Sequence, residues 1–96
     1  MKIDFSKVRV QMEFEGPSQT VDIRKPLGNH IHQTTGDLAM DQLARDIYFS
    51  AQPVELTQEQ AQAVLEAARQ KFVCPVWQGL EQQMNNNQKK EEEVAS

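Results

Sequence analysis

The spacing of the hydrophobic residues changes near Pro26. Before this proline, apolar residues alternate with polar ones in two runs, and after it they recur at intervals of three and four. Alternation is typical of a β-strand with one buried face, and the longer interval is typical of an amphipathic helix. The pattern predicts an α+β fold, with an N-terminal antiparallel β-hairpin of two or three short strands followed by three to four short helices.

The strands are predicted from the alternating runs. Ile3 and Phe5 start a short strand, and a turn or bulge at 6–7 is expected because the alternation changes phase there. The main strand is expected over 8–15, and its partner over 20–24, with the loop Gly16-Pro17-Ser18 between them. The residues expected to face the core are Val8, Val10, Met12, Phe14, Val21 and Ile23.

Three to four helices are predicted after the hairpin. A short one carries Pro26 in its first turn and ends by 34–36, and a second starts at Asp37. The third starts at Thr57, where Gln60 completes a capping box, and the segment 54–56 before it is expected to be extended. The residues expected to be buried on the second helix are Leu38, Met40, Leu43, Ala44, Ile47 and Tyr48, and those on the third are Ala61, Val64, Leu65, Ala68 and Phe72.

The last helix is expected to start near Pro75 and to carry an apolar stripe at Trp77, Leu80 and Met84. From residue 85 onward the composition is almost entirely polar and charged. We therefore expect one domain over 1–84 and a polar, disordered tail over 85–96.

Composition and charge narrow the class of protein. The chain has 96 residues and a formal net charge of −4, which does not favour a sequence-independent nucleic-acid binder, since that would need a basic face. A single cysteine rules out an intramolecular disulfide. No signal-peptide pattern or long apolar run is present, so a cytoplasmic location without membrane association follows by elimination.

The residues that could carry chemistry do not form a recognisable motif. His30, His32 and Cys74 are the softer metal ligands, but their spacing is not that of a structural zinc site. Cys74 is expected to be a buried structural thiol. The isolated glycines belong to no phosphate-binding loop. We therefore predict no catalytic, cofactor-binding or metal-binding residues, no cofactor, and a non-enzymatic protein.

Two kinds of partner remain open. The helices over 37–51 and 57–72 could form a helix-turn-helix-like pair in a small DNA-binding regulator, although the second helix lacks a clear base-reading face. The other partner is a protein, or a second copy of this chain. The last helix either closes the core or exposes its stripe as an anchor, since tryptophan and methionine are enriched at interfaces. The candidate contacts with a protein partner are Trp77, Leu80, Met84, Gln11, Glu13 and Arg24.

Two segments resemble parts of small uncharacterised proteins encoded by bacterial prophages and other mobile elements. One reads VDIRKPLGNHI over 21–31, and the other reads VELTQEQA over 54–61. The resemblance covers roughly residues 20 to 65, includes Asp37-Leu38-Ala39-Met40 and Leu43-Ala44, and brings no catalytic residues with it. It implies an accessory role in a phage or mobile element. We therefore expect a non-enzymatic accessory protein that acts through protein–protein contacts.

Overall fold

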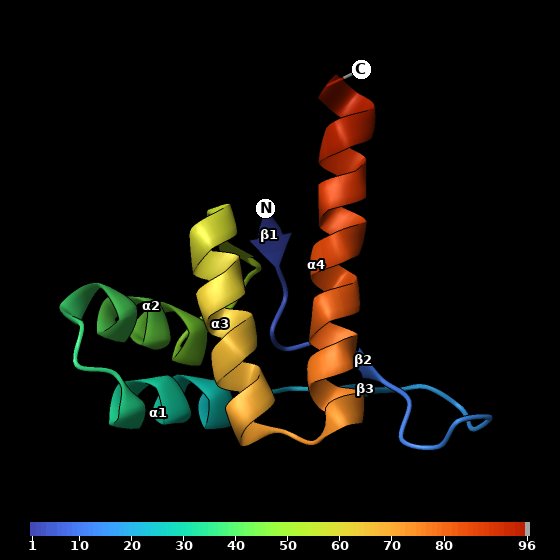
Figure 1. Cartoon of the computed structure of the whole chain (residues 1–96), viewed down its shortest axis with the longest axis horizontal. Helices are drawn as coiled ribbons and strands as arrows, with labels where there is room; N and C mark the ends of the chain where they lie inside the picture. The colour runs from blue at the N-terminus through green and yellow to red at the C-terminus, as the bar shows by residue number, and fades with distance from the viewer. Residues whose placement is uncertain (96) are drawn as a thin grey trace.

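The computed structural model describes the backbone of residues 1–95 and the side chains of residues 1–87. It has an α+β fold with short N-terminal strands followed by helices, as the change of hydrophobic period predicts (Figure 1). In chain order the elements are β1 (Lys2–Ile3), β2 (Val8–Val10), β3 (Gln19–Val21), α1 (Arg24–Thr34), α2 (Leu38–Tyr48), β4 (Val54–Glu55), α3 (Gln58–Lys71) and α4 (Cys74–Ala95).

The strands form two separate antiparallel pairs. Strands β2 and β3 form the predicted hairpin, in which Val8 lies opposite Val21. Strand β1 pairs with β4, which is the extended segment expected before the third helix, and the N–H of Leu56 continues this pairing by donating to the carbonyl of Met1 at 2.7 Å. The second pair joins the N-terminus to the middle of the chain.

The main strand is shorter than predicted, and the prediction that Met12 and Phe14 face the core is wrong. Strand β2 ends at Val10, and beyond it Met12 is 56% exposed and Phe14 is fully exposed. The Gln11 side-chain amide donates to the carbonyls of Phe14 and Gly16, which folds the chain into a loop instead of a strand. The alternation of apolar residues therefore continues to Phe14, but the pairing with β3 ends at Val10 and the later apolar side chains are not buried.

The partner strand also ends early. Strand β3 ends at Val21, so Ile23 is buried as predicted but lies at the N-cap of α1 and not in the hairpin. Helix α1 begins at Arg24, and Pro26 lies in its first turn, where a proline is tolerated because the N–H groups there have no intrahelical partner.

Helices α1 and α2 pack closely against each other. Gly28 permits this approach, because a Cβ atom at this position would lie 2.9 Å from both the Ala44 carbonyl oxygen and the Tyr48 Cβ. The Asp37 carboxylate caps α2 by accepting from the N–H of Ala39 at 2.9 Å. The prediction that Leu38 is buried is wrong: it is 86% exposed, because it occupies the first turn, before the face of α2 that contacts α1.

Helices α3 and α4 run antiparallel (Figure 1). The predicted capping box starts α3: the Thr57 hydroxyl accepts from the N–H of Gln60 at 3.2 Å, and the Gln60 side chain accepts from the N–H of Thr57 at 2.9 Å. Helix α4 is longer than the stripe that predicted it, and it continues to Ala95 through the segment expected to be a disordered tail. No proline or glycine interrupts that segment, so its backbone can stay helical. Ser96 lies outside the described residues.

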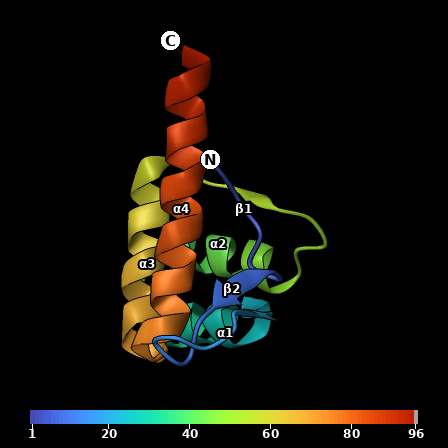
Figure 2. The same cartoon turned by 90° about the vertical axis from the view of Figure 1, so that its right-hand side faces the viewer.

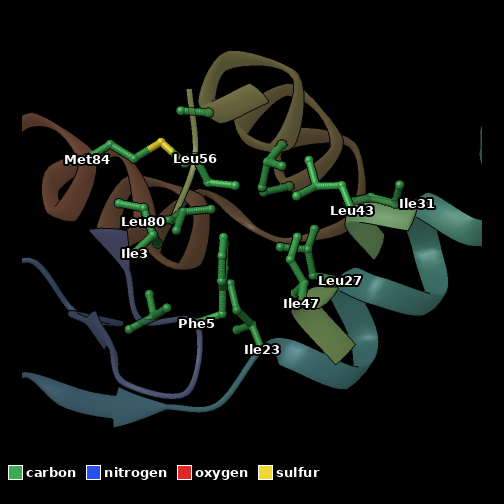
Figure 3. Packing of buried hydrophobic residues seen from close by; sticks show 14 of the residues in the cluster. Ile3, Phe5, Ile23, Leu27, Ile31, Leu43, Ile47, Leu56, Leu80 and Met84 are labelled. Atoms are coloured by element: carbon green, nitrogen blue, oxygen red, sulfur yellow. The ribbon is translucent and has the colours of Figure 1, made fainter. Parts of the chain in front are cut away.

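One hydrophobic core joins all the helices to the N-terminal strands (Figure 3). Ile3 and Phe5 enter it from the N-terminal segment, and Leu80 and Met84 enter it from α4. Among the described side chains, no polar or charged residue is fully buried in it. The buried set is Ile3, Phe5, Val8, Val10, Ile23, Leu27, Ile31, Leu43, Ala44, Ile47, Leu56, Ala61, Val64, Ala68, Leu80 and Met84.

Candidate interaction groove

A continuous groove lies between the hairpin and α4. It consists of two adjoining clefts, of about 500 Å³ and about 470 Å³, which share Arg9, Gln11, Ser18, Gly79 and Gln82. We call it the α4–β2 groove. Toward the start of α4 it is also lined by Met12, Glu13, Phe14, Cys74, Pro75 and Gln78. Toward the middle of α4 it is also lined by Asp4, Lys7, Gln83 and Asn86.

The middle of the groove is where strand β2 meets helix α4. The backbone of β2 reaches α4 at Gly79, where an added Cβ atom would overlap the Arg9 carbonyl oxygen and lie 3.3 Å from Val8. Val8 and Val10 point into the core, while Arg9 between them is exposed. The close approach at Gly79 thus holds the Arg9 side chain on the outer face of β2, beside the helix.

The hairpin loop forms one wall of the groove. In this loop the Gln11 Nε2 atom lies 2.9 Å from the Phe14 carbonyl and 3.1 Å from the Gly16 carbonyl, and the N–H of Gly16 donates to the Glu13 carbonyl at 3.2 Å. These bonds shape a loop that leaves Met12 and Phe14 exposed, and Figure 1 shows it extending away from the body of the fold. Two large apolar side chains on an exposed loop are typical of an interaction surface when they lie beside a groove.

The groove is lined by charged side chains of both signs. Neither Lys7 nor Arg9 forms an ion pair within the described part of the chain, and both are exposed. Asp4 is already engaged, since its Oδ1 accepts from the N–H of Ser6 at 3.0 Å and from the Ser6 hydroxyl at 2.5 Å. The groove is therefore lined by two cations and two carboxylates, with Arg9 in both clefts, Lys7 and Asp4 in the second and Glu13 in the first.

Side-chain amides form much of the rest of the groove. Gln78, Gln82 and Asn86 come from successive turns of α4, and Gln82 is shared by both clefts. Gln83 has a structural role, because its Oε1 accepts from the N–H of Asp4 at 2.6 Å and its Nε2 donates to the Asp4 carbonyl at 3.3 Å. An amide both donates and accepts, which suits it to a peptide backbone.

The residues predicted to contact a partner are brought together only in part. Gln11 and Glu13 both line the groove. Leu80 and Met84 are buried in the core, in agreement with the interpretation in which α4 closes the core. Sequence reasoning missed Met12 and Phe14, because their alternation with polar residues is the same signal that marks a buried strand face.

Trp77 lies on the side of α4 that faces α3. It is half-buried, and the Arg69 guanidinium carbon lies 5.0 Å from its ring centroid. Arg69 also pairs with Glu81 at 2.8 Å. These contacts place Trp77 in the packing between two helices, and it does not line the α4–β2 groove.

Arg24 lies at the start of α1 and joins two local elements. Its guanidinium pairs with Asp22 at 2.7 Å and also donates to the carbonyl of Ser50, just after α2. The hydrogen bonds from the Arg24 side chain and backbone hold the pKa of the Asp22 carboxyl below its ordinary value. The same side-chain bond raises the pKa of Arg24. Arg24 is engaged within the fold and does not line the α4–β2 groove.

The histidines and the cysteine lie in different places. His32 contacts the Asp41 carboxylate through Nδ1, and the Nε2 of His30 is buried without a hydrogen-bond partner. Cys74 is exposed at the start of α4, so the prediction of a buried thiol is wrong. Among the described residues, no group of three histidine, cysteine, aspartate or glutamate side chains is arranged to hold a metal ion.

A smaller cleft of about 260 Å³ lies between α1 and α2. Tyr48 and Phe49 form one side, with ring centroids 4.7 Å apart in an edge-to-face arrangement. Arg45 and His32 also line it, and both lie near Asp41. Arg45 and His32 thus contact the same carboxylate, whereas Arg9 and Lys7 in the α4–β2 groove form no ion pair within the described residues.

The helix pair considered for DNA recognition is arranged differently from a helix-turn-helix. Helix α2 packs mainly against α1, while α3 packs against α1 and α4 (Figure 2). A helix-turn-helix places its recognition helix by packing it on the helix before it. This arrangement gives no support to that candidate function.

The chain matches no protein-family model, and comparisons with curated proteins and with solved structures find no similar protein. No helix in the described part of the chain has the length and apolar composition needed to cross a bilayer.

Proposed function

We propose that this chain is a non-enzymatic accessory protein that acts in the cytoplasm through contacts with another protein. The observation that carries the proposal is the exposure of Met12 and Phe14 on a hydrogen-bonded loop beside the α4–β2 groove. Large apolar side chains contribute most to the free energy of binding when a partner covers them and excludes water. The role in a phage or mobile element rests on the sequence resemblance over residues 20 to 65.

Several features of the described residues support contact rather than catalysis. The two carboxylates that line the groove, Asp4 and Glu13, come from opposite ends of it. Cys74 has no histidine among the residues that line its cleft. Amides, two cations and an apolar rim together suit a polypeptide ligand.

The test is affinity capture from the native host with three versions of the full chain. The wild type is compared with the double variant Met12→Ser/Phe14→Ser and with Leu38→Ser, and captured proteins are quantified by mass spectrometry. Leu38 is the matched control, because it is a large exposed apolar residue on α2, outside the groove. The proposal predicts a protein captured by the wild type and by Leu38→Ser and reduced about tenfold or more by the double variant.

Two results would contradict the proposal. One is equal capture by all three versions, which would remove the loop from the contact. The other is enrichment of nucleic acid, with no protein that depends on the loop, which would favour the DNA-binding regulator. Circular dichroism of the double variant should match the wild type, because neither side chain is buried.

A further inference from the structure

We infer that the outer edge of β3 binds a second copy of this chain, so that the two hairpins form one continuous antiparallel sheet about a two-fold axis at Thr20. This inference goes beyond the proposed function, because it concerns the backbone of β3 and not the α4–β2 groove. It is carried by the direction of the Arg9 carbonyl, the open edge of β3, and the exposure of Phe14 and Phe49 near opposite ends of that strand.

The hydrogen-bonding phase of the hairpin follows from the contact at Gly79. A Cβ atom at residue 79 would lie 2.0 Å from the Arg9 carbonyl oxygen but 3.1 Å from the carbonyl carbon, so this C=O points toward α4 and away from β3. Arg9 lies opposite Thr20, and the two residues of such a pair either exchange hydrogen bonds or both point their N–H and C=O groups outward. The Thr20 N–H and C=O therefore lie on the outer edge of β3, away from β2.

The outer edge of β3 is open. In the described part of the chain β3 pairs only with β2, and no backbone hydrogen bond from another element reaches residues 19–21. Gln19 and Thr20 are exposed. The strand carries no charge, proline or bulge, which are the features that keep an edge strand from pairing with another chain. A further strand can therefore add to this edge.

A second copy fits this edge in an antiparallel register centred on Thr20. In this register each Thr20 exchanges two backbone hydrogen bonds with the partner's Thr20, and threonine pairs across antiparallel strands are favourable. On either side of the centre, Gln19 lies opposite the partner's Val21 and Ser18 lies opposite the partner's Asp22. No like charges face each other, so the edge is complementary to itself.

The exposed aromatic residues favour a copy of the same chain over an unrelated strand. Phe14 lies in the loop before β3 and is fully exposed. Phe49 is 77% exposed and lies toward the other end of β3, because Arg24, shortly after that strand, donates to the carbonyl of Ser50. A two-fold axis through the middle of β3 brings the start of the strand in one copy beside its end in the other. Each Phe14 then lies toward the partner's Phe49, so one arrangement covers two exposed apolar residues in each copy.

The test is a charge swap at Thr20 in the full chain, measured by analytical ultracentrifugation. The inference predicts that the wild type forms a dimer and that Thr20→Lys and Thr20→Glu each weaken it about fivefold or more, since like charges then face each other. An equal mixture of the two variants should restore the dimer, because only a residue on the two-fold axis faces its own copy. Thr20 is exposed, so both variants should melt within a few degrees of the wild type.

Gln19→Lys and Gln19→Glu are the matched controls. Gln19 is exposed and lies one residue from the axis, where it faces the partner's Val21. Each control variant should form the dimer within about twofold of the wild-type affinity, and mixing the two should change the affinity by less than about twofold. Phe49→Ser is a second probe. It should weaken the dimer without unfolding the chain, because the side chain is exposed.

Two results would overturn the inference. One is a wild type that remains a monomer at about 1 mM, the concentration at which even a weak complex forms. The other is a dimer that the folded Thr20 variants do not weaken, or that their mixture does not restore.

The outcomes separate this inference from the proposed function. Neither Thr20 nor Phe49 lines the α4–β2 groove. If the wild type is a monomer but capture of a different host protein depends on Met12 and Phe14, only the dimer is excluded. If the Thr20 charge swap restores a dimer but no other host protein depends on the loop for its capture, the dimer stands and the proposed function fails.

Discussion

Gly79 of α4 lies directly against the backbone carbonyl of Arg9 in β2. The contact joins a hairpin from the start of the chain to the last helix, and a side chain larger than hydrogen at residue 79 would overlap the strand backbone. The same contact places Arg9 beside the helix and so forms the middle of the α4–β2 groove.

Gly79→Ala should therefore destabilise the fold although alanine is the better helix former. A backbone carbonyl cannot rotate away as a flexible side chain can, so the strand must shift from the helix, and we expect a loss of about 3 kcal/mol. Urea unfolding of the variant measures this loss. Gly36→Ala is the control, because no atom lies within 4 Å of a Cβ at that position. Equal stability of the two variants would show that β2 does not pack on α4 at residue 79.

The core face of the hairpin can be tested by charge. Val10 and Ile23 are both almost fully buried, so Val10→Asp or Ile23→Asp would place an unpaired carboxylate in a small core. We expect each to lower the free energy of unfolding by about 3 kcal/mol or more. Arg9→Asp, at the exposed position beside Val10, should be mild. Thermal melts of the three variants decide the register, and a similar loss at positions 9 and 10 would contradict it.

The capping box should make a measurable local contribution to α3. Thr57→Ala removes the hydroxyl that accepts from the N–H of Gln60, and we expect a loss of about 1 kcal/mol. Gln58→Ala changes the next residue, which is exposed, and should be close to neutral. Chemical denaturation of both variants measures the difference, and an equal effect of the two changes would mean that the box does not stabilise the helix start.

Asp22 should contribute to stability above its own pKa and not below it. The hydrogen bonds from Arg24 lower the pKa of this carboxyl in the folded state, so the ionised form is favoured by folding. A lowered folded-state pKa gives stability that is present above the unfolded pKa of about 4 and is lost as the pH falls through the folded value. Asp22→Asn should therefore unfold at slightly lower urea than the wild type at pH 7, with the gap closing as the pH falls below about 4 and through the folded-state pKa.

The matched control for this pH series is Glu66→Gln. Glu66 is exposed on α3 and has no ion pair within the described residues, so its removal should leave the urea midpoint nearly unchanged at every pH. The effect at Asp22 is expected to be small, because its side chain is 46% exposed and solvent screens the pair. If the difference in urea midpoint between Asp22→Asn and the wild type persisted unchanged at acidic pH, it would arise from capping of α1 and not from the charge of Asp22.

Truncation tests the C-terminal part of α4. Removal of residues 88–96 deletes a segment that is almost entirely polar in sequence, while Met84 keeps residues 85–87 beyond it. Figures 1 and 2 show this end of α4 extending past the other elements. The melting temperature should change by less than about 2 °C. A larger drop in melting temperature would show that the segment packs on the domain. Leu80→Ala is the comparison variant, because it removes a buried core side chain and its drop in melting temperature shows how large a loss of packing is.

The amino-acid sequence alone determined the local elements of this protein. Alternation at Val8 and Val10 specified a strand, and the apolar intervals through Leu43, Ala44 and Ile47 specified a helix, because side-chain period is a property of the backbone itself. The Thr57 capping box and the Asp37 cap were equally readable, since capping uses residues close in sequence.

Only the tertiary structure decided which apolar residues are covered and which segments meet. Met12, Phe14 and Leu38 follow the same periods as core residues, yet all three are exposed. The pairing of β1 with β4 and the contact of Gly79 with Arg9 join positions more than fifty residues apart, and no local pattern records such partners. Burial depends on what packs against a face, so periodicity predicts the face and only long-range packing determines whether it becomes core or an exposed site for a partner.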